Sequence, residues 1–505
     1  MSNTIVVSRS VCNACGVCVQ TCPQLVYEQK PGECPEVAHP ERCFGCLACE
    51  EDCAHGGITV HRLPDGMSVG QIPAPGTGLD GDRVYDMVVV GAGPAGLAAA
   101  MRARRLGLSV AVLDRLPSSR RSHHPDGGLL FASPDTTAVA DRPDGMHLDR
   151  FDITIPAAMV RDRLRDFVFM GPDGLATRTS RGRPVFPYVF KDDLIGLIVD
   201  RTLELGTTIA WNTRVQAIRR DRNSGLMSVS YDDDRRVQGR VVISAEGSTG
   251  RLAERAGIPV NAQKTGWAYA AMAQFDPQPR PSGELGFLVG PIAGSPVDVP
   301  FLSFWATGHD HTELAAGPLQ LRKTRVLEEP LENYLARLAE WDARVVARVG
   351  GPIDLQARRR FDGCRVFARR LPQTAVGDGV LAVGDAIATC GMCTTLAAMR
   401  TGDMAAEVAA GALARGDTSV EPLKEFDRRV FELTMIQGMK WMHNLLIEAP
   451  LRLKEPDLRA LFEMLQHLNL TRLMSGSAML ALVPFYLRNL IPMASRRDLR
   501  RYLIP

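Results

Sequence analysis

The stretch YDMVVVGAGPAG, residues 85–96, joins a short apolar strand to a glycine-rich turn and the start of an Ala/Leu-rich helix. Gly91 permits the tight turn, Gly93 lets the backbone approach a pyrophosphate, and Gly96 lets the helix pack closely on the strand. The N-terminus of that helix then faces the negative charge of the phosphates. A second apolar strand ends at Asp114, whose carboxylate would bind a ribose hydroxyl. This order of strand, turn, helix and acid predicts a Rossmann-type dinucleotide-binding domain.

The composition is that of an ordinary globular protein. The chain has 505 residues, of which 45% are hydrophobic and 23% charged, and this length suits roughly three or four domains. The 59 Lys and Arg residues are balanced by 57 Asp and Glu, giving a net charge of +2, so we expect no nucleic-acid partner. The N-terminal residues lack a secretory signal pattern, and no apolar run reaches the ~20 residues that span a bilayer. We therefore expect a cytoplasmic protein.

Cysteines are concentrated near the N-terminus, where nine of the twelve fall within the first 53 residues. Eight of them form two runs with the spacing C-x2-C-x2-C-x3-C, and Cys34 lies between the runs, where we expect a structural role. Three thiolates at this spacing can wrap one face of a [4Fe–4S] cluster, while the fourth ligates the other cluster. The expected ligand sets are Cys12, Cys15, Cys18 and Cys53 for one cluster, and Cys43, Cys46, Cys49 and Cys22 for the other. Residues 1–62 resemble bacterial two-cluster ferredoxins, and a pair of zinc sites is the alternative.

Two later segments resemble those of a flavoprotein superfamily. Residues 241–252, VVISAEGSTGRL, form a strand that ends in an acid–glycine pair. Residues 380–386, VLAVGDA, form another strand that leads into a helix containing AMRTGD at 398–403. With the glycine-rich turn, these segments resemble the para-hydroxybenzoate hydroxylase superfamily over residues 84–415. Within it they are most similar to the geranylgeranyl reductases and the electron transfer flavoprotein–ubiquinone oxidoreductases.

This resemblance implies FAD as the cofactor. Asp385 would bind the ribityl–phosphate stretch, the pair Gly127–Gly128 would lie beside the flavin, and Val215 falls on the strand that meets the adenine. Lys191 stands where the family commonly has an arginine. The helix after Asp385 would face the pyrimidine edge, where its positive N-terminus stabilises reduced flavin. The expected cofactor-binding residues are Gly91, Gly93, Gly96, Asp114, Gly127, Gly128, Lys191, Val215, Glu246, Gly247, Gly384 and Asp385.

Together these motifs predict a multidomain chain of α/β and α+β units. A ferredoxin-like domain, 1–62, is followed by a flexible Gly/Pro-rich linker, 63–83. The remaining units are a Rossmann-type FAD-binding domain of 84–135, 191–260 and 362–415, an interleaved sheet-based substrate domain of 136–190 and 261–361, and a helical C-terminal region of 416–505. The C-terminal helices either pack on the catalytic domain, contact a membrane surface peripherally, or line an apolar tunnel.

Candidate catalytic residues lie near the expected flavin. Cys390 and Cys393 precede the helix that should face the flavin, and a helix N-terminus lowers a thiol pKa; a redox role and simple packing are both open. The histidines considered for acid–base chemistry are His123, His124, His309 and His311. The aromatic–proline motif of prenyl reductases is not found in the expected substrate domain, which leaves the substrate open.

The expected function is an FAD-dependent oxidoreductase that reduces a C=C bond of an apolar or conjugated small molecule. Electrons would arrive from an external ferredoxin or similar carrier through the two clusters, because the chain has no second dinucleotide fingerprint for NAD(P)H. The alternative is a dehydrogenase that passes electrons from a substrate or flavoprotein through the clusters to a carrier or quinone. A purely electron-carrying protein would not need a substrate domain of this size, and a monooxygenase would expose its clusters to O2.

The cysteine runs predict about eight iron and eight acid-labile sulfide atoms per chain, because eight cysteines match two [4Fe–4S] clusters. Iron and sulfide analysis of anaerobically purified protein, with EPR of the reduced form, measures this content. Half of that content would contradict two clusters, and zinc in place of iron would support the zinc alternative.

Overall fold

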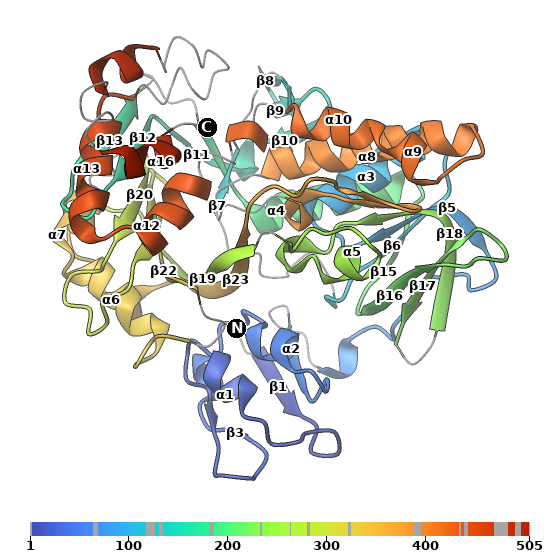
Figure 1. Cartoon of the computed structure of the whole chain (residues 1–505), viewed down its shortest axis with the longest axis horizontal. Coiled ribbons are helices and arrows are strands. Elements are labelled where there is room, and N and C mark those ends of the chain that lie inside the picture. The colour runs from blue at the N-terminus through green and yellow to red at the C-terminus, as the bar shows by residue number, and fades with distance from the viewer. Residues whose placement is uncertain are drawn as a thin grey trace.

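The computed structural model describes most of the chain. The described residues are 3–63, 69–117, 127–130, 135–180, 186–232, 235–262, 264–279, 283–321, 325–387, 395–433, 436–438, 443–468, 483–489 and 496–503. Figure 1 shows a sheet flanked by long helices, a second sheet beside it, and the N-terminal segment beneath both.

The first sheet contains the glycine-rich turn. Its strand order is β15-β6-β5-β18-β17-β16, with β25 also paired to β18. Strands β15, β6, β5, β18 and β25 run parallel, and β17 and β16 are antiparallel to their neighbours. The strands are β5 (Val84–Val90), β6 (Val110–Leu113), β15 (Thr208–Ala210), β16 (Val215–Arg220), β17 (Met227–Tyr231), β18 (Arg235–Ser244), β24 (Val376–Gly377) and β25 (Val380–Ala382). The apolar runs of the parallel strands are buried because helices cover the sheet.

Glycines allow the helices of this domain to pack closely. A Cβ on Gly402, in helix α8 (Thr395–Ala414), would lie 1.9 Å from the carbonyl oxygen of Ala95 in helix α3 (Pro94–Arg105). A side chain there would force the two helices apart. Helices α4 (Lys191–Glu204), α5 (Arg251–Arg255), α9 (Val420–Leu423) and α10 (Glu425–Phe431) complete this part of the fold.

The second sheet has seven strands in the order β13-β12-β20-β21-β22-β19-β23. Strands β12 and β20 are parallel, and all other neighbours are antiparallel. The strands are β12 (Asp166–Met170), β13 (Ala176–Ser180), β19 (Lys264–Phe275), β20 (Glu284–Gly290), β21 (Phe301–Thr307), β22 (Thr312–Gln320) and β23 (Arg360–Arg369).

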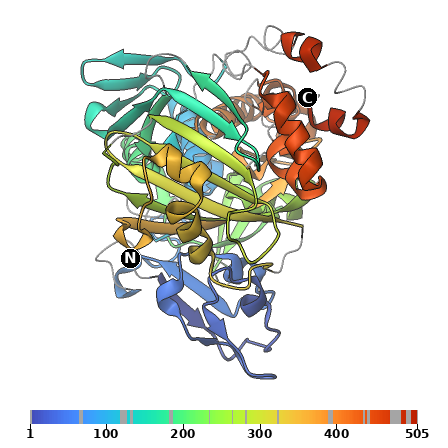
Figure 2. The ribbon, with the colours of Figure 1, turned by 90° about the vertical axis from the view of Figure 1, so that its left-hand side faces the viewer.

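Both faces of this sheet are apolar because side chains alternate along each strand. Phe167 and Phe169 face the C-terminal helices, and Phe169 stacks on Phe462 with ring centroids 5.4 Å apart. Val168 and Met170 face the opposite layer, formed by α6 (Leu331–Glu340) and α7 (Ala343–Val349). Figure 2 shows this sheet above the N-terminal segment, with the C-terminal helices to one side.

Strand β23 differs from its expected place. The sequence assigned 362–415 to the FAD-binding domain, but β23 pairs antiparallel with β19 from Arg360 to Arg369 and is the last strand of the second sheet. Its neighbour in sequence, the Gly-Asp-Ala segment, belongs to the first sheet. Strand β23 therefore connects the two sheets.

Smaller elements lie between the sheets and at the C-terminus. One three-stranded sheet joins β11 (Val160–Leu164), β14 (Phe186–Phe190) and β7 (Gly127–Leu129), and another joins β8 (Val139–Arg142), β9 (Gly145–Leu148) and β10 (Ile153–Pro156). The described C-terminal helices include a π-helix at Asn444–Glu448, α12 (Ala449–Arg452), α13 (Glu455–Leu465) and α16 (Arg500–Leu503). Among the described residues, no helix has the length and apolar character needed to cross a bilayer.

Residues 3–62, which we call the cysteine module, repeat one local structure twice. Strand β1 (Asn3–Val7) pairs antiparallel with β4 (Ile58–Arg62), and β2 (Tyr27–Glu28) with β3 (Glu36–Val37). Each cysteine run ends in a short helix, α1 (Val17–Thr21) or α2 (Ala48–Asp52). The residues on either side of the second cysteine are left-handed in both runs, with φ of 60° and 71° at Ala14 and Gly16, and 72° and 62° at Gly45 and Leu47. The two runs thus fold alike, although Ala and Leu rarely adopt this conformation.

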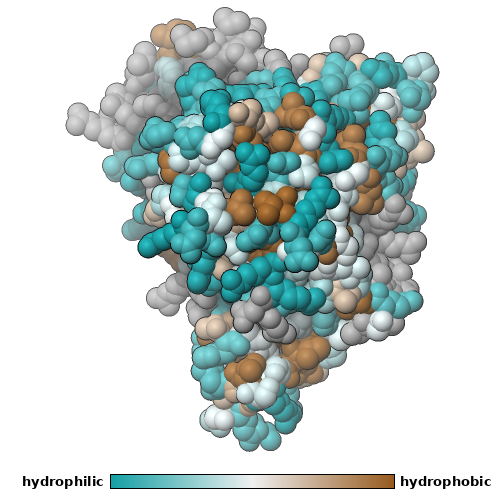
Figure 3. Space-filling view, turned by 90° about the vertical axis from the view of Figure 1, so that its right-hand side faces the viewer, coloured by the Kyte–Doolittle hydropathy of each residue, from teal (hydrophilic) through white to brown (hydrophobic). Residues whose placement is uncertain are grey.

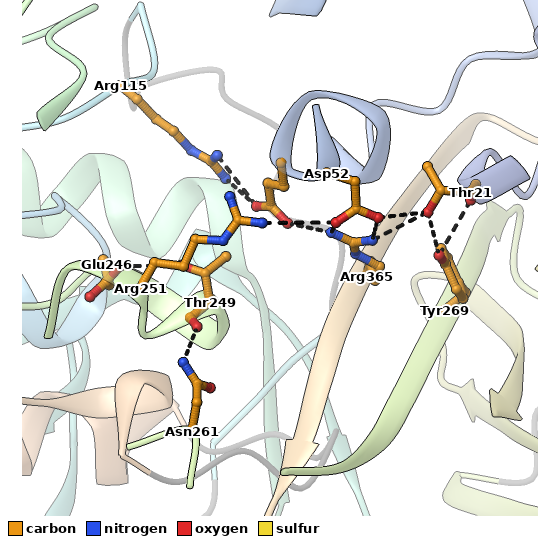
Figure 4. A network of polar contacts seen from close by, with 10 residues as sticks. Thr21, Asp52, Arg115, Glu246, Thr249, Arg251, Asn261, Tyr269 and Arg365 are labelled. Atoms are coloured by element: carbon orange, nitrogen blue, oxygen red, sulfur yellow. Dashed lines mark hydrogen bonds and ion pairs between the residues drawn. The ribbon is translucent and has the colours of Figure 1, made fainter. Parts of the chain in front are cut away.

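The cysteine module packs directly on strand β23, whereas the sequence predicted a detached module. The Phe44 ring lies over Gly363, where a Cβ would stand 1.8 Å from a ring carbon, and it meets the Phe361 ring edge-on at 5.8 Å between centroids. Beside it, the guanidinium of Arg365 donates two hydrogen bonds to the carboxylate of Asp52, at 2.6 and 3.0 Å (Figure 4). These contacts join residues more than 300 positions apart, so sequence spacing could not indicate them.

The linker is also held in place where the structure describes it. The N–H of Gly76 donates to the Thr213 hydroxyl at 2.7 Å, and the Asn212 amide donates to the Pro73 carbonyl at 2.9 Å. Its Gly/Pro content predicted a flexible linker, but irregular backbone can be fixed by bonds to distant side chains.

Substitution of Gly363 by Ala should weaken docking of the cysteine module, because the new methyl group overlaps the Phe44 ring. Overpacking of this kind costs roughly 1–3 kcal/mol. Limited proteolysis within 63–83 should be faster than in the wild type, and the thermal midpoint should fall. Gly196→Ala is the matched control, because nothing lies within 4 Å of that Cβ position. Equal proteolysis of all three proteins would contradict this packing.

Candidate functional site

The candidate cofactor site lies where the parallel strands of the first sheet end. Strands β5, β6, β18 and β25 all finish at this edge, and ligands of such sheets bind beyond the carboxyl ends of the strands. Gly91 has a φ of 104°, and a Cβ there would lie 2.3 Å from the Ala245 carbonyl oxygen. A Cβ on Gly96 would lie 1.9 Å from the Gly91 carbonyl oxygen, whereas nothing lies within 4 Å of the same position on Gly93. The turn is therefore closely packed except at Gly93, which leaves room for a pyrophosphate.

Asp114 is fixed beside this turn. Its carboxylate accepts hydrogen bonds from the N–H groups of Ala92, at 2.6 Å, and Leu116, at 2.7 Å. Burial raises the pKa of Asp114, and the two backbone bonds oppose that rise. The carboxylate stands at the end of β6, where the ribose of a dinucleotide is expected, and its contact with the ribose remains a prediction.

Glu246 and Gly247 follow β18 at the same edge. The Glu246 carboxylate accepts from the N–H groups of Leu252 and Ala253, at 2.9 and 2.7 Å, and from the Ser244 hydroxyl at 3.0 Å. It thereby caps the first turn of α5. The predicted contact between Glu246 and the cofactor remains a prediction, since its carboxylate oxygens already bond to the protein.

Gly384 and Asp385 lie at the end of β25, next to α8. Gly384 has a φ of 62°, and its N–H donates to the Thr401 hydroxyl at 2.9 Å, which fixes the turn against the helix. A Cβ on Gly384 would lie 2.9 Å from that of Ala95. The segment Gly384–Asp385 is thus brought to the glycine-rich turn, as the predicted site requires.

Arg369 is a residue at this edge that sequence reasoning missed. It ends strand β23, is 2% exposed, and donates from Nη1 to the Ala386 carbonyl oxygen at 3.0 Å. Within the described residues, its Nε and Nη2 atoms have no hydrogen-bond partner. Burial lowers the pKa of Arg369 to about 10, against the attraction of Asp385 and Glu246. A buried cation with two donors to spare suits an anionic or oxygen-rich ligand. The only sequence signal is an arginine pair that ends an apolar strand.

The remaining predicted cofactor residues fall in two places. Strand β7 pairs with β14 so that Gly127 stands opposite Phe190, and Lys191 follows directly at the start of α4. Val215 instead begins β16, at the outer edge of the first sheet, and pairs with Tyr231. The structure therefore brings Gly127, Gly128 and Lys191 together, whereas Val215 follows two residues after Thr213, whose N–H donates to the Asp114 carbonyl oxygen at 2.7 Å.

Of the predicted catalytic and acid–base residues, the structure describes His309 and His311. Cys390, Cys393, His123 and His124 lie outside the described residues. His309 is exposed. His311 is buried, and burial lowers its pKa to about 4, so the imidazole is neutral at physiological pH.

Tyr188 and Glu313 form a hydrogen-bonded pair beside His311 that the sequence did not indicate. The His311 ring packs at a tilt of 36° against Tyr188, with centroids 4.3 Å apart, and the Tyr188 hydroxyl donates to the buried Glu313 carboxylate. Gln274 donates to the same carboxylate at 2.9 Å. Because Tyr188 pairs with Leu129, next to Gly128, this group lies near the glycine pair. The signal that could have found it is a glutamate within an otherwise apolar strand.

The eight cysteines of the two runs form two groups. One pocket is lined by the inner set, which we define as Cys22, Cys43, Cys46 and Cys49. The Tyr27 hydroxyl donates to the Cys49 sulfur at 3.1 Å, and burial raises the pKa of Cys43 to about 11. One cysteine of this set comes from the first run and three from the second, as the sequence spacing requires for a cluster. Such buried thiols would stay neutral unless a cation or a metal centre bound them.

The outer set, Cys12, Cys15, Cys18 and Cys53, lies nearer the surface. Cys15 is exposed, and the Cys53 sulfur accepts from the Gly57 N–H at 3.1 Å. The pKa of Cys18 is raised to about 11, mainly by burial and in part by its neighbours Cys12 and Cys15. In the part of the chain that the structure describes, no group of His, Cys, Asp or Glu side chains is arranged to hold a single metal ion.

Known proteins match the flavin-binding part of the chain. Residues 86–338 match the family "FAD dependent oxidoreductase". A digeranylgeranylglycerophospholipid reductase of Methanocaldococcus jannaschii is 23% identical over 354 residues, covering 68% of this chain and 82% of that protein. These findings confirm the expected flavoprotein resemblance. They leave the cysteine module and its clusters as predictions.

Solved structures share the fold. A geranylgeranyl bacteriochlorophyll reductase-like protein of Thermoplasma acidophilum aligns with a TM-score of 0.59 at 16% identity, covering 83% of this chain and 99% of that one. The halogenase PltM, solved with FAD, aligns with a TM-score of 0.55 at 14% identity, covering 83% and 85%. The predicted mixed α/β FAD-binding fold is confirmed. With its glycine-rich turn, Asp114 and Gly384–Asp385 at one sheet edge, the chain belongs to the FAD-dependent oxidoreductase family.

Proposed function

We propose that this protein reduces a C=C bond of an apolar or conjugated substrate, with electrons that pass from an external ferredoxin or similar carrier through two [4Fe–4S] clusters to FAD. The observation that supports this proposal best is that four cysteines from the two runs line one pocket. The cysteine module that contains them packs beside the cofactor edge. The reverse direction, a dehydrogenase that delivers electrons to a carrier or quinone, would use the same residues.

The donor set supports a cluster better than a single ion. A [4Fe–4S] cluster binds each cysteine through a different iron. Its four thiolates therefore stand farther apart than four thiolates bound to one zinc ion, each with a Zn–S bond of about 2.3 Å. The inner set lines one pocket with three cysteines of the second run and one of the first, which is the ligand pattern of a two-cluster ferredoxin. Left-handed residues beside Cys15 and Cys46 turn the backbone of both runs in the same way, which suits N–H groups directed at a common anion.

The position of the module supports electron transfer to FAD. Arg115, directly after the ribose-binding position Asp114, pairs with Glu51 of the module at 3.4 Å. Arg251, which begins α5 after β18, pairs with Asp52 at 3.8 Å. The module thus contacts two of the loops that form the expected cofactor site.

The residues of the site have separate tasks when the cofactors are bound. FAD supplies hydride at N5 and the clusters supply single electrons. Gly93 leaves space for the pyrophosphate, Asp114 holds a ribose, and Arg369 offers two buried donors. Reduction of a C=C bond also needs a proton, and the Tyr188 hydroxyl, bonded to Glu313, is a candidate to hold it. The redox role of Cys390 and Cys393 stays a proposal.

The apolar character of the substrate is proposed from the similar proteins. The C-terminal helices pack on the second sheet through a closed apolar cluster that includes Phe287 and Phe485. The reductases that resemble this chain are named for geranylgeranyl compounds, which are apolar and unsaturated. Peripheral contact of these helices with a membrane, and a cytoplasmic location, remain part of the proposal.

An external carrier would meet the cysteine module at its outer side. Figure 3 shows apolar side chains at the surface of this part of the molecule, and Val6 and Val11 are 46% and 47% exposed. Val11 directly precedes Cys12 of the outer set, so a small electron carrier could approach that set closely.

Replacement of Gly93 by Val should remove most of the bound FAD while leaving the fold intact, because the position is open in the protein alone but faces the pyrophosphate. We expect at least about a tenfold loss of affinity, ~1.4 kcal/mol. The measurement is FAD released on denaturation per chain, with the circular dichroism spectrum as the check on folding. Gly81→Val is the control, since that position is also open. Release of FMN, or full FAD content in Gly93→Val, would contradict the assignment.

A further inference from the structure

The two cysteine sets differ in their distance from the rest of the chain. Phe44, between the first two cysteines of the second run, packs on Gly363, and Cys46 packs against the apolar layer of the second sheet. The outer set faces away, with Cys15 exposed. If the sets hold clusters, the inner one lies against the second sheet and the outer one lies toward solvent.

Arginines from outside the cysteine module surround the acidic helix α2, which carries Cys49 of the inner set. Helix α2 contains Cys49 and three successive carboxylates at 50–52. The arginines that pair with these carboxylates are Arg115, Arg214, Arg251 and Arg365. Four arginines thus pair with the three successive carboxylates of α2.

Arg365 is the most buried of these cations. Its side chain is fully buried, and it pairs with Asp52 at 2.6 Å and with Glu51 at 3.1 Å. Its Nη1 also reaches the hydroxyl of Thr21, next to Cys22, at 3.4 Å. Figure 4 shows Arg365 between Asp52 and Thr21, and so between the two helices α1 and α2. It therefore stands beside the segments that supply Cys22 and Cys49 of the inner set, and its partner Asp52 directly precedes Cys53 of the outer set. Arg365 also attracts the Cys46 thiolate of the inner set electrostatically.

We infer that Arg365 is a positioning residue that raises the reduction potential of the inner cluster above that of the outer one, so that electrons move from the outer set to the inner set and then to the flavin. This inference rests on the proposed function. Reduction adds one negative charge to a cluster, and a buried cation close by stabilises the reduced form. The hydrogen bond from Tyr27 to Cys49 acts in the same direction.

Strand β23 connects the two ends of this route. It carries Arg365 at the module and Arg369 at the cofactor edge, four residues or about 13 Å apart in an extended strand. Two one-electron deliveries by a low-potential carrier, each passing through both clusters, would together with two protons from water reduce one FAD.

The test is a potentiometric EPR titration of the full-length protein with both clusters and FAD bound. Arg365→Gln removes the cation but keeps a donor toward Asp52. At a fixed applied potential the ratio of reduced to oxidised inner cluster should fall about tenfold, which is a decrease of ~59 mV in its reduction potential. Glu51→Gln removes a neighbouring anion and should raise it. Cys46→Ser and Cys15→Ser identify the inner and outer signals.

Opposite shifts of the inner signal, with the outer signal unchanged, would support the inference, because general damage to the interface would move both variants the same way. Arg344→Gln is the matched control, since it breaks a buried ion pair with Asp342 in the second sheet's helical layer. Three results would overturn the inference. In the wild type, the outer cluster could have a higher reduction potential than the inner one. In the variants, Arg365→Gln and Glu51→Gln could shift the inner potential in the same direction, or only the outer signal could shift. Absence of iron would instead contradict the proposed function.

Discussion

The buried ion pair between Arg365 and Asp52 is the constraint on which the arrangement of this protein depends. Burying such a pair removes two charges from water, so its net effect on the free energy of unfolding can be close to zero. Its geometry is what matters: a two-pronged bond from a rigid strand fixes helix α2, and with it Cys49 and Cys53, against the second sheet. The cysteine module therefore has one orientation relative to the cofactor edge.

Strand β23 links the bound cysteine module to the cofactor edge. It belongs to the second sheet by pairing, carries the contact with Phe44 and Asp52 in its middle, and ends at Arg369 beside Ala386. The module, the second sheet and the end of β25 thus meet along one extended segment. A module connected only by its linker would have no fixed position relative to the cofactor edge, whereas this contact holds it against β23.

The sequence could predict what short-range chemistry determines. The glycine-rich turn and Asp114 are adjacent through one strand–helix–strand unit, and the cysteine runs carry three of each cluster's four expected ligands within seven residues. It could not predict the docking of the module, because Arg365 and Asp52 are 313 residues apart and neither lies in a motif. Arg369 and Tyr188 were missed for the same reason. The capping of α5 by the Glu246 carboxylate was also not predicted from its place after β18, and its contact with the cofactor stays a prediction.

The central claim is that electrons reach the flavin through the cysteine module, and anaerobic stopped-flow reduction tests it most directly. Flavin absorbance should fall quickly when wild-type protein is mixed with reduced ferredoxin, and slowly or not at all with NADPH. Cys46→Ser should block the ferredoxin reaction while its flavin is still reduced by dithionite. Cys364→Ser, a cysteine in neither set, should behave as the wild type. Fast, stoichiometric reduction of the Cys46→Ser flavin by NADPH would contradict the account.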